Sequence, residues 1–343
     1  MTAPRPRPLP TLACVALLLA APSALPAAGH DLLVAASINS SSRVMGSGTG
    51  APDGLYVRAA GQEAFTHVGA NMPLLITVVA DPRDRSRLFA AGLSGVMRSA
   101  DGGRSWRIVT GWAETEPKAL ALDPVDPDTV YAGLPDGFVV SRDRGQTWRR
   151  SEAGLPDRGK YVQCLQVDRT VRGRILLGCE SGIWLSEDGA ATWRRVFAAT
   201  DTVNDIQQSP HDPARWLAVS QSAGVLESSD GGRTWTALPG LAREQAWYNV
   251  AFHPRDPARL ALASWTYGLW TSADGGRTWA ERNVGLPAPT RVWRTAFDPD
   301  DGRLYAAVYE RALYASTDLG GTWTETALPG SVIRSFTFVP AVR

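Results

Sequence analysis

Short apolar runs alternate with turn residues along almost the whole chain. The stretch KALALDPVDPDTVYAGLPDGFVVSRDRGQTWRRS, residues 118–151, contains four such runs, separated by Asp-Pro, Pro-Asp-Gly and Asp-Arg-Gly. Runs of this kind, rich in Val, Leu, Tyr and Phe, are typical of β-strands joined by tight turns. We name the four predicted strands A to D in chain order. Beyond the N-terminal segment no sustained helical period occurs, so the sequence predicts an almost entirely β protein.

The four-strand pattern recurs with a nearly constant period. An octet such as SADGGRTW joins strands C and D six times, and its tryptophans are spaced by 42, 45, 42, 44 and 44 residues. A degenerate seventh copy, Gly54 to Phe65, has Ala60 and Phe65 in place of the Asp and the Trp. Such a period is the length of one four-stranded propeller blade. The Asp and Trp residues of the six octets are Asp101, Trp106, Asp143, Trp148, Asp188, Trp193, Asp230, Trp235, Asp274, Trp279, Asp318 and Trp323.

The composition of the octet predicts a structural turn. The Asp carboxylate can accept hydrogen bonds from backbone N–H groups, Gly supplies a positive φ angle, and the Trp can pack beneath the turn. The octet S-x-D-x-G-x-[ST]-W is similar to the Asp-box, or bacterial neuraminidase repeat, although Ala190 replaces a Gly in the copy that begins at Ser186. The resemblance implies Asp-box turns at the blade periphery, away from the central site.

The number of copies predicts an all-β fold, a single seven-bladed β-propeller of four-stranded blades. The terminal IRSFTFVP is similar to the A strands, and DLLVAAS near the N-terminus is similar to a B strand, so we expect the C-terminal strand to complete blade 1 and close the ring. We expect a signal peptide at 1–27 and the propeller at 28–343. The expected blades are 28–70 plus 331–343, 71–112, 113–155, 156–199, 200–242, 243–286 and 287–330.

The N-terminal segment, with Arg5 and Arg7 before a short apolar run, is typical of an export signal. We therefore expect a periplasmic or extracellular protein without membrane insertion. Losing both arginines changes the formal net charge from +1 to −1, which argues against a nucleic-acid partner. We expect a monomer. Cys164 and Cys179 flank the predicted A-to-B turn of one blade, and pairing of these strands about the middle of VDRTVRGRI would set the two residues opposite each other. In an oxidising compartment we therefore expect a disulfide between them.

The octets also raise the question of catalysis. Sialidases with Asp-boxes carry an Arg-Ile-Pro signature that is missing here, whereas xyloglucan-cleaving glycosidases resemble two such propellers facing each other. A glycosidase needs two carboxylates about 5 to 10 Å apart. No pair stands out among the acids of the predicted D-to-A loops, so we assign no catalytic residue. These acids are Glu114, Glu116, Asp157, Asp201, Asp205, Glu244 and Glu310.

The mouth of the predicted central channel is the candidate ligand site. Aligning the blades on the turn proline puts polar and aromatic residues at one position of the A strands, where positions further along are mostly apolar. The candidate ligand-binding residues are Lys118, Gln163, Asn204, Trp247, Tyr248, Arg291, Trp293, Arg294 and Arg334. The long segment from Ile38 to Asp53 is an alternative site. The four histidines have no metal-ligand spacing and no motif indicates a cofactor, so we expect neither.

The function predicted from these features is an exported non-catalytic propeller, a protein-binding or assembly module with an unknown protein or peptide partner. Photosystem II stability and assembly factors and sortilin-type receptors are similar in architecture. The alternative is a carbohydrate-binding or glycoside-hydrolase-like protein that binds a glycan through aromatic and acidic residues on the same face. If the chain is an enzyme, we expect a glycoside hydrolase.

Overall fold

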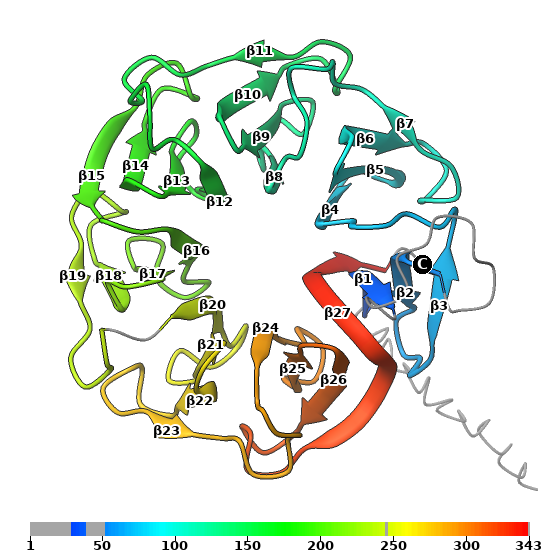
Figure 1. The fold of residues 1–343 in the computed structure, drawn as a ribbon, viewed down its shortest axis with the longest axis vertical. Helices are drawn as coiled ribbons and strands as arrows, with labels where there is room; N and C mark the ends of the chain where they lie inside the picture. The colour runs from blue at the N-terminus through cyan, green and yellow to red at the C-terminus, as the bar shows by residue number, and fades with distance from the viewer. Residues whose placement is uncertain (1–28, 39–51, 244–245, 342–343) are drawn as a thin grey trace, which may run out of the picture.

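The computed structural model describes residues 29–38, 52–243 and 246–341. These residues form 27 β-strands and no α-helix, and the sheets are arranged radially around a central axis, as in a propeller (Figure 1). No helix among them is long and apolar enough to cross a membrane. The predicted signal peptide and most of the segment from Ile38 to Asp53 lie outside the described residues.

Five sheets have four antiparallel strands each, in the order predicted from the repeats. They comprise β4 (Thr77–Asp81), β5 (Asp84–Gly92), β6 (Gly95–Ser99) and β7 (Arg107–Ile108); β8 (Ala119–Leu122), β9 (Val130–Leu134), β10 (Gly137–Ser141) and β11 (Arg149–Arg150); β12 (Val162–Val167), β13 (Ile175–Cys179), β14 (Gly182–Ser186) and β15 (Arg194–Ala198); β16 (Val203–Gln208), β17 (Trp216–Ser220), β18 (Val225–Ser228) and β19 (Thr236–Ala237); β20 (Trp247–Phe252), β21 (Leu260–Ser264), β22 (Gly268–Ser272) and β23 (Ala280–Glu281).

A sixth sheet has seven strands, because the long strand β27 belongs to two successive parts of it. The order is β24 (Val292–Phe297), β25 (Leu304–Val308), β26 (Arg311–Ser316), β27 (Thr324–Pro340), β1 (His30–Ile38), β2 (Gly54–Arg58) and β3 (Phe65–Val68). The first part of β27 pairs with β26, and the residues from Ser331 to Pro340 pair with β1. The C-terminal segment thus lies beside the first described strand (Figure 1).

The strand nearest the axis in each four-stranded sheet contacts the corresponding strand of the next sheet, and β27 contacts both β24 and β4. The core consists of clusters of buried apolar side chains. One cluster combines Tyr131 and Phe138 with Val162 and Leu177 of the neighbouring sheet. At about 25 cal/mol per Å² of apolar surface, burial between successive sheets is the main stabilisation of this arrangement.

The octets form the turns between the third and fourth strands, as predicted from their composition. In the copy that ends at Trp279, Ser272 Oγ donates to Asp274 Oδ1 (2.8 Å), and the backbone N and hydroxyl of Thr278 both donate to the same carboxylate. The indole N–H of Trp279 donates to the carbonyl of Gly276 (3.1 Å). In the copy with Ala190, the backbone N–H of Ala190 donates to Ser186 Oγ (2.9 Å), as that of Gly276 donates to Ser272 Oγ (2.8 Å). Ala190 has a φ of 70°, so this copy retains the turn without a glycine at that position.

The expected register of the two cysteines is wrong. A bulge between Val162 and Cys164 pairs Cys179 with Val162 and Cys164 with Gly178, so the two cysteines are not opposite each other. Both are free and buried in the structure. The Sγ atom of Cys164 contacts the carbonyl of Val203 on the next sheet (3.5 Å), and burial raises the pKa of both thiols, that of Cys179 to about 12.

Deletion of residues 333–343 should destabilise the whole domain, although terminal segments are usually dispensable. The deletion removes most of the β27 partner of β1 and exposes Leu32 and Val34, which are fully buried. We expect a markedly lower denaturant midpoint, or an insoluble product. A soluble truncated protein with the midpoint of the full chain would contradict the structural role of this pairing.

Acid should destabilise the octet turns. Hydrogen bonds from Ser and Thr hold the pKa of Asp101 and Asp274 at about 2, below the ordinary value near 4. A folded-state pKa below the unfolded one stabilises the fold above the unfolded pKa, and this contribution is lost as the pH falls from about 4 to 2. We expect the melting temperature to fall in that range, and less steeply in Asp274→Asn. If the melting temperature fell equally steeply with pH in the parent and in Asp274→Asn, the ionised Asp274 would not have the stabilising role described here.

Candidate functional site

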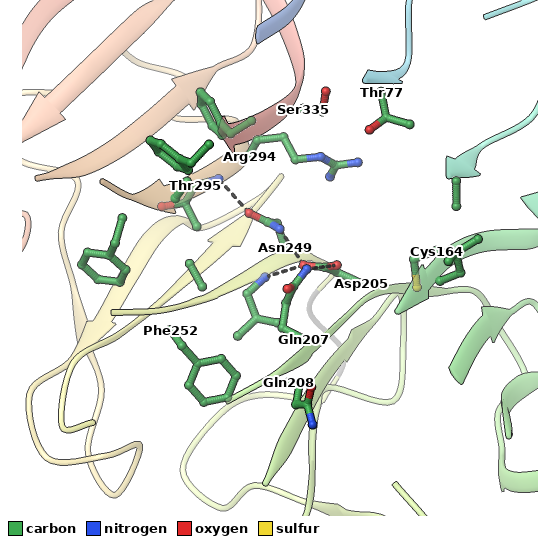
Figure 2. A pocket seen from close by; sticks show the side chains of 18 of the residues that line it. Thr77, Cys164, Asp205, Gln207, Gln208, Asn249, Phe252, Arg294, Thr295 and Ser335 are labelled. Carbon is green, nitrogen blue, oxygen red and sulfur yellow. Dashed lines mark hydrogen bonds between the residues drawn. The ribbon is translucent and has the colours of Figure 1, made fainter. Parts of the chain in front are cut away.

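A cavity of about 560 Å³ runs along the strands nearest the axis. Its lining extends from residues at the beginning of these strands, such as Gln163 and Asn204, to prolines that follow the strands, such as Pro210 and Pro254. We call the end at the beginning of the strands the D–A end, because the loops that connect the fourth strand of one sheet to the first of the next lie there. Figure 2 shows the side chains in this cavity.

β-Bulges explain why polar and aromatic residues gather at the D–A end. The registers of β12, β16, β20, β24 and β27 each shift by one residue near the beginning of the segment beside the cavity. An extra residue at a bulge is outside the ladder, and the bulge redirects its side chain. The extra residues are Gln163, Asn204, Tyr248, Trp293 and Arg334.

Of the nine predicted ligand-binding residues, five line the cavity: Lys118, Gln163, Asn204, Arg294 and Arg334. Tyr248, Trp293 and Arg291 instead belong to an aromatic cluster described below. The assignment of Trp247 is wrong. Trp247 precedes the bulge and pairs with Ser264, so its ring points into the core, where it is fully buried and donates to the carbonyl of Ala242 (3.3 Å).

The aromatic cluster consists of Tyr248, Trp265, Trp293 and Tyr309, from two neighbouring sheets. The ring centroids of Trp265 and Tyr309 are 4.8 Å apart, those of Tyr248 and Trp293 5.0 Å, and those of Trp265 and Trp293 5.6 Å. All four side chains are partly exposed. The sequence analysis missed Trp265 and Tyr309, which directly follow β21 and β25. In an antiparallel sheet the turn after the second strand lies beside the start of the first strand. The position of Trp265 and Tyr309 directly after predicted second strands could therefore have identified both residues.

Two arginines contact the faces of this cluster. The Arg291 guanidinium carbon lies 5.1 Å from the Trp265 centroid, and that of Arg294 lies 5.4 Å from the Trp293 centroid. Cations at these distances are attracted to the ring faces. The indole N–H of Trp293 is buried and finds no hydrogen-bond partner among the described residues. The cluster therefore combines apolar faces with an unused donor.

Asp205 is the one acid among the described residues that line the cavity. Its carboxylate accepts hydrogen bonds from Asn249 Nδ2 (2.6 Å), Val250 N (3.1 Å), Ile206 N (3.0 Å) and Gln207 Nε2 (3.0 Å), contacts that Figure 2 shows in part. Burial raises the pKa of Asp205, and these donors oppose the shift. Both oxygens of this acid are therefore already occupied by donors of the protein.

Asn249 connects three sheets beside the cavity. Its Nδ2 donates to Asp205 on β16, and its Oδ1 accepts from the backbone N of Thr295 on β24 (2.8 Å). Asn204 makes a further connection, because its Nδ2 donates to the carbonyl of Trp247 (2.7 Å). Part of the polar lining thus holds neighbouring sheets together. In the described parts of the chain, no three His, Cys, Asp or Glu side chains come together as a metal site would require.

The curated proteins similar to this chain include xyloglucanases. The Paenibacillus sp. xyloglucanase is 26% identical over 226 residues, which cover 50% of this chain and 22% of that protein. Xyloglucanase Xgh74A of Acetivibrio thermocellus is 28% identical over 166 residues, covering 36% and 20%. The oligoxyloglucan-reducing end-specific xyloglucanase of Emericella nidulans is 27% identical over 190 residues, covering 48% and 24%. The matched regions thus span about a quarter or less of these relatives. No protein-family model matches.

Solved propellers share the fold. The GH74 xyloglucanase of Xanthomonas campestris superposes with a TM-score of 0.62 at 21% identity, covering 76% of this chain and 46% of that one. An ancestral GH74 enzyme gives 0.64 at 16% identity, covering 79% and 39%. YCF48 bound to a D1 peptide gives 0.57 at 19% identity, covering 74% and 83%. At such identities these likenesses support the β-propeller fold alone.

The curated relatives overturn the first functional prediction. We expected a non-catalytic protein-binding or assembly module, but the relatives in sequence are glycoside hydrolases, which favours the carbohydrate alternative. The prediction was wrong because the missing catalytic acid pair was taken as evidence for a protein partner. An aromatic surface for sugars needs no such pair.

Asn249→Ala should lower the free energy of unfolding by about 3 kcal/mol, because it leaves the Thr295 N–H without a partner and removes one of the two donors to Asp205 Oδ2. Gln207→Ala is the matched control: Gln207 also donates to Asp205 but belongs to the same strand, so a smaller loss, about 1 kcal/mol, is expected. Chemical denaturation measures both. Equal losses in the two variants would contradict a connecting role for Asn249.

Proposed function

We propose that this chain is a carbohydrate-binding propeller, similar to one propeller of a glycoside hydrolase, and that sugar rings bind against the aromatic cluster at the D–A end of the cavity. The observation that carries the proposal is the gathering of four partly exposed aromatic rings from two sheets beside a polar cavity. Ligand sites typically combine such apolar surfaces with a few converging polar groups. The sequence similarity to xyloglucanases supports a polysaccharide as the ligand.

The chemistry of the cluster suits a sugar. One face of a pyranose ring presents C–H groups, which pack against aromatic rings, while its hydroxyls need hydrogen-bond partners. Trp265 and Trp293 are partly exposed and offer apolar ring surface for this packing. Gln163 and Lys118 line the same cavity from other sheets and supply further donors. We include Asn204, Tyr248, Arg291, Arg294 and Arg334 in the proposed site.

Binding, rather than hydrolysis, is the activity we assign to the cavity itself. Glycoside hydrolysis requires a carboxylic acid and a second carboxylate on opposite sides of the scissile bond. Asp205 is the single acid in the described lining, and four donors already occupy its oxygens. If the protein is an enzyme, we expect a glycoside hydrolase. Its second carboxylate would then come from residues that do not line this cavity.

We further propose that residues 28–343 form one ring of seven blades, with the seven-stranded sheet counted as two blades. The series of contacts among β4, β8, β12, β16, β20, β24 and β27 supports this proposal. The pairing of β27 with β1 would then complete blade 1. An exported protein, as the N-terminal segment suggests, would meet polysaccharides outside the cell.

The test is calorimetric titration with xyloglucan oligosaccharides. A combined Trp265→Ala and Trp293→Ala variant should keep its fold and bind roughly tenfold more weakly or worse, because two ring contacts are lost. Trp112→Ala is the matched control, since this Trp is 98% exposed on another D-to-A loop, between β7 and β8, and lies outside the cluster. Unchanged affinity in the double variant, or no binding by the parent, would contradict the proposal.

A further inference from the structure

Three cationic residues from two sheets line the D–A end of the cavity. Lys118 precedes β8, Arg294 lies on β24, and Arg334 is the extra residue of the bulge in β27. The other arginine of the lining, Arg169, follows β12 and so lies at the opposite end. Among the described residues that line the cavity, these three cations are accompanied by a single acid, Asp205.

Backbone carbonyls hold the Arg294 guanidinium in place. Its Nε donates to the carbonyl of Arg334 (2.8 Å), and its Nη1 donates to the carbonyls of Trp293 (3.1 Å) and Tyr248 (3.3 Å). Figure 2 shows its guanidinium extending into the cavity, toward the side where Thr77 lies. No carboxylate of the described residues forms an ion pair with it, in contrast to the buried Arg58, which pairs with Asp298 (2.6 Å).

A largely buried guanidinium that contacts only neutral carbonyls is costly to desolvate. Accordingly, desolvation lowers the pKa of Arg294, and the negative charge of Asp205 offsets this shift through space. Asp205 does not serve as a contact partner, since its oxygens accept the four donors described above. An anionic group of a ligand would supply the missing charge and form short, charge-assisted hydrogen bonds with the outer edge of the guanidinium.

We infer that the glycan bound here is acidic, and that the carboxylate of a uronic acid residue binds the Arg294 guanidinium in the cavity while neighbouring sugar rings lie against the aromatic cluster. Lys118 lines the same cavity from β8, on the opposite side of the ring from β24 (Figure 1), and adds to the attraction for the carboxylate. This inference rests on the proposed carbohydrate-binding function and narrows its ligand class. The guanidinium carbon of Arg294 is 5.4 Å from the Trp293 centroid, so one sugar residue can reach both the ring and the cation. Lys118 already pairs with Glu116 (3.2 Å), a half-exposed partner that a ligand carboxylate can replace.

The experiment compares two matched ligands by calorimetry at low salt. One is a xylooligosaccharide that carries a glucuronosyl residue, and the other is the same oligosaccharide after reduction of its carboxyl group to an alcohol. The acidic ligand should bind at least about tenfold more tightly. Arg294→Gln and, separately, Lys118→Gln should reduce this preference to a few-fold or less without weakening the neutral ligand comparably. Lys118→Gln keeps the test decisive if the Arg294 variant fails to fold.

Arg169→Gln is the control, because it removes a positive charge from the same cavity at the end remote from the proposed site, and it should keep the full preference. Equal affinity for acidic and reduced ligands would overturn the inference and leave carbohydrate binding intact. A preference that persists in the Lys118 variant, or that Arg169→Gln abolishes, would also overturn it. If the preference for the acidic ligand holds but the Trp265→Ala and Trp293→Ala variant binds normally, sugar binding at the aromatic cluster is contradicted. Carboxylate binding at Arg294 is then still supported.

Discussion

The pairing of β27 with both β26 and β1 is the constraint on which the arrangement of the sheets depends. A single strand contributes to two successive parts of the seven-stranded sheet, and residues far apart in sequence form one apolar cluster across it, including Leu32, Tyr305 and Ile333. Elsewhere each sheet consists of residues local in sequence. The pairing of β27 with β1 therefore brings together the ends of the described chain. Because β27 also contacts β24 and β4, it connects the inner strands on either side of it along the cavity.

The same strand also shows how the repeats produce a site. Bulges near the start of five segments beside the cavity remove one residue each from the ladder, and these residues have diverged into Gln, Asn, Tyr, Trp and Arg. Core positions must stay apolar and ladder positions must stay in register, whereas a bulge residue is released from both requirements. A repeated architecture can thus carry a surface whose side chains differ from one repeat to the next.

The sequence was sufficient for the strands and turns because their signals are local. Gly, Asp and Ser in the octets specify the turn through contacts within eight residues, as the bonds of Asp274 illustrate. The bulges were not predictable, since register depends on packing against the next sheet. This explains the wrong register of Cys164 and Cys179, and the wrong assignment of Trp247, which lies one residue before a bulge. Five of the nine site residues line the cavity because the alignment on the turn proline located the strand starts.

The function required information that local patterns do not contain. A scarcity of acid pairs is compatible with either a protein ligand or a sugar, and only the aromatic cluster and the xyloglucanase relatives favour the sugar. The most direct measurement is a crystal structure of the protein with a glucuronosyl xylooligosaccharide. The account predicts sugar rings against Trp265 and Trp293, with a carboxylate at Arg294. Ligand density beside the octet turns would contradict it. So would an aromatic cluster without ligand density in crystals saturated with the oligosaccharide.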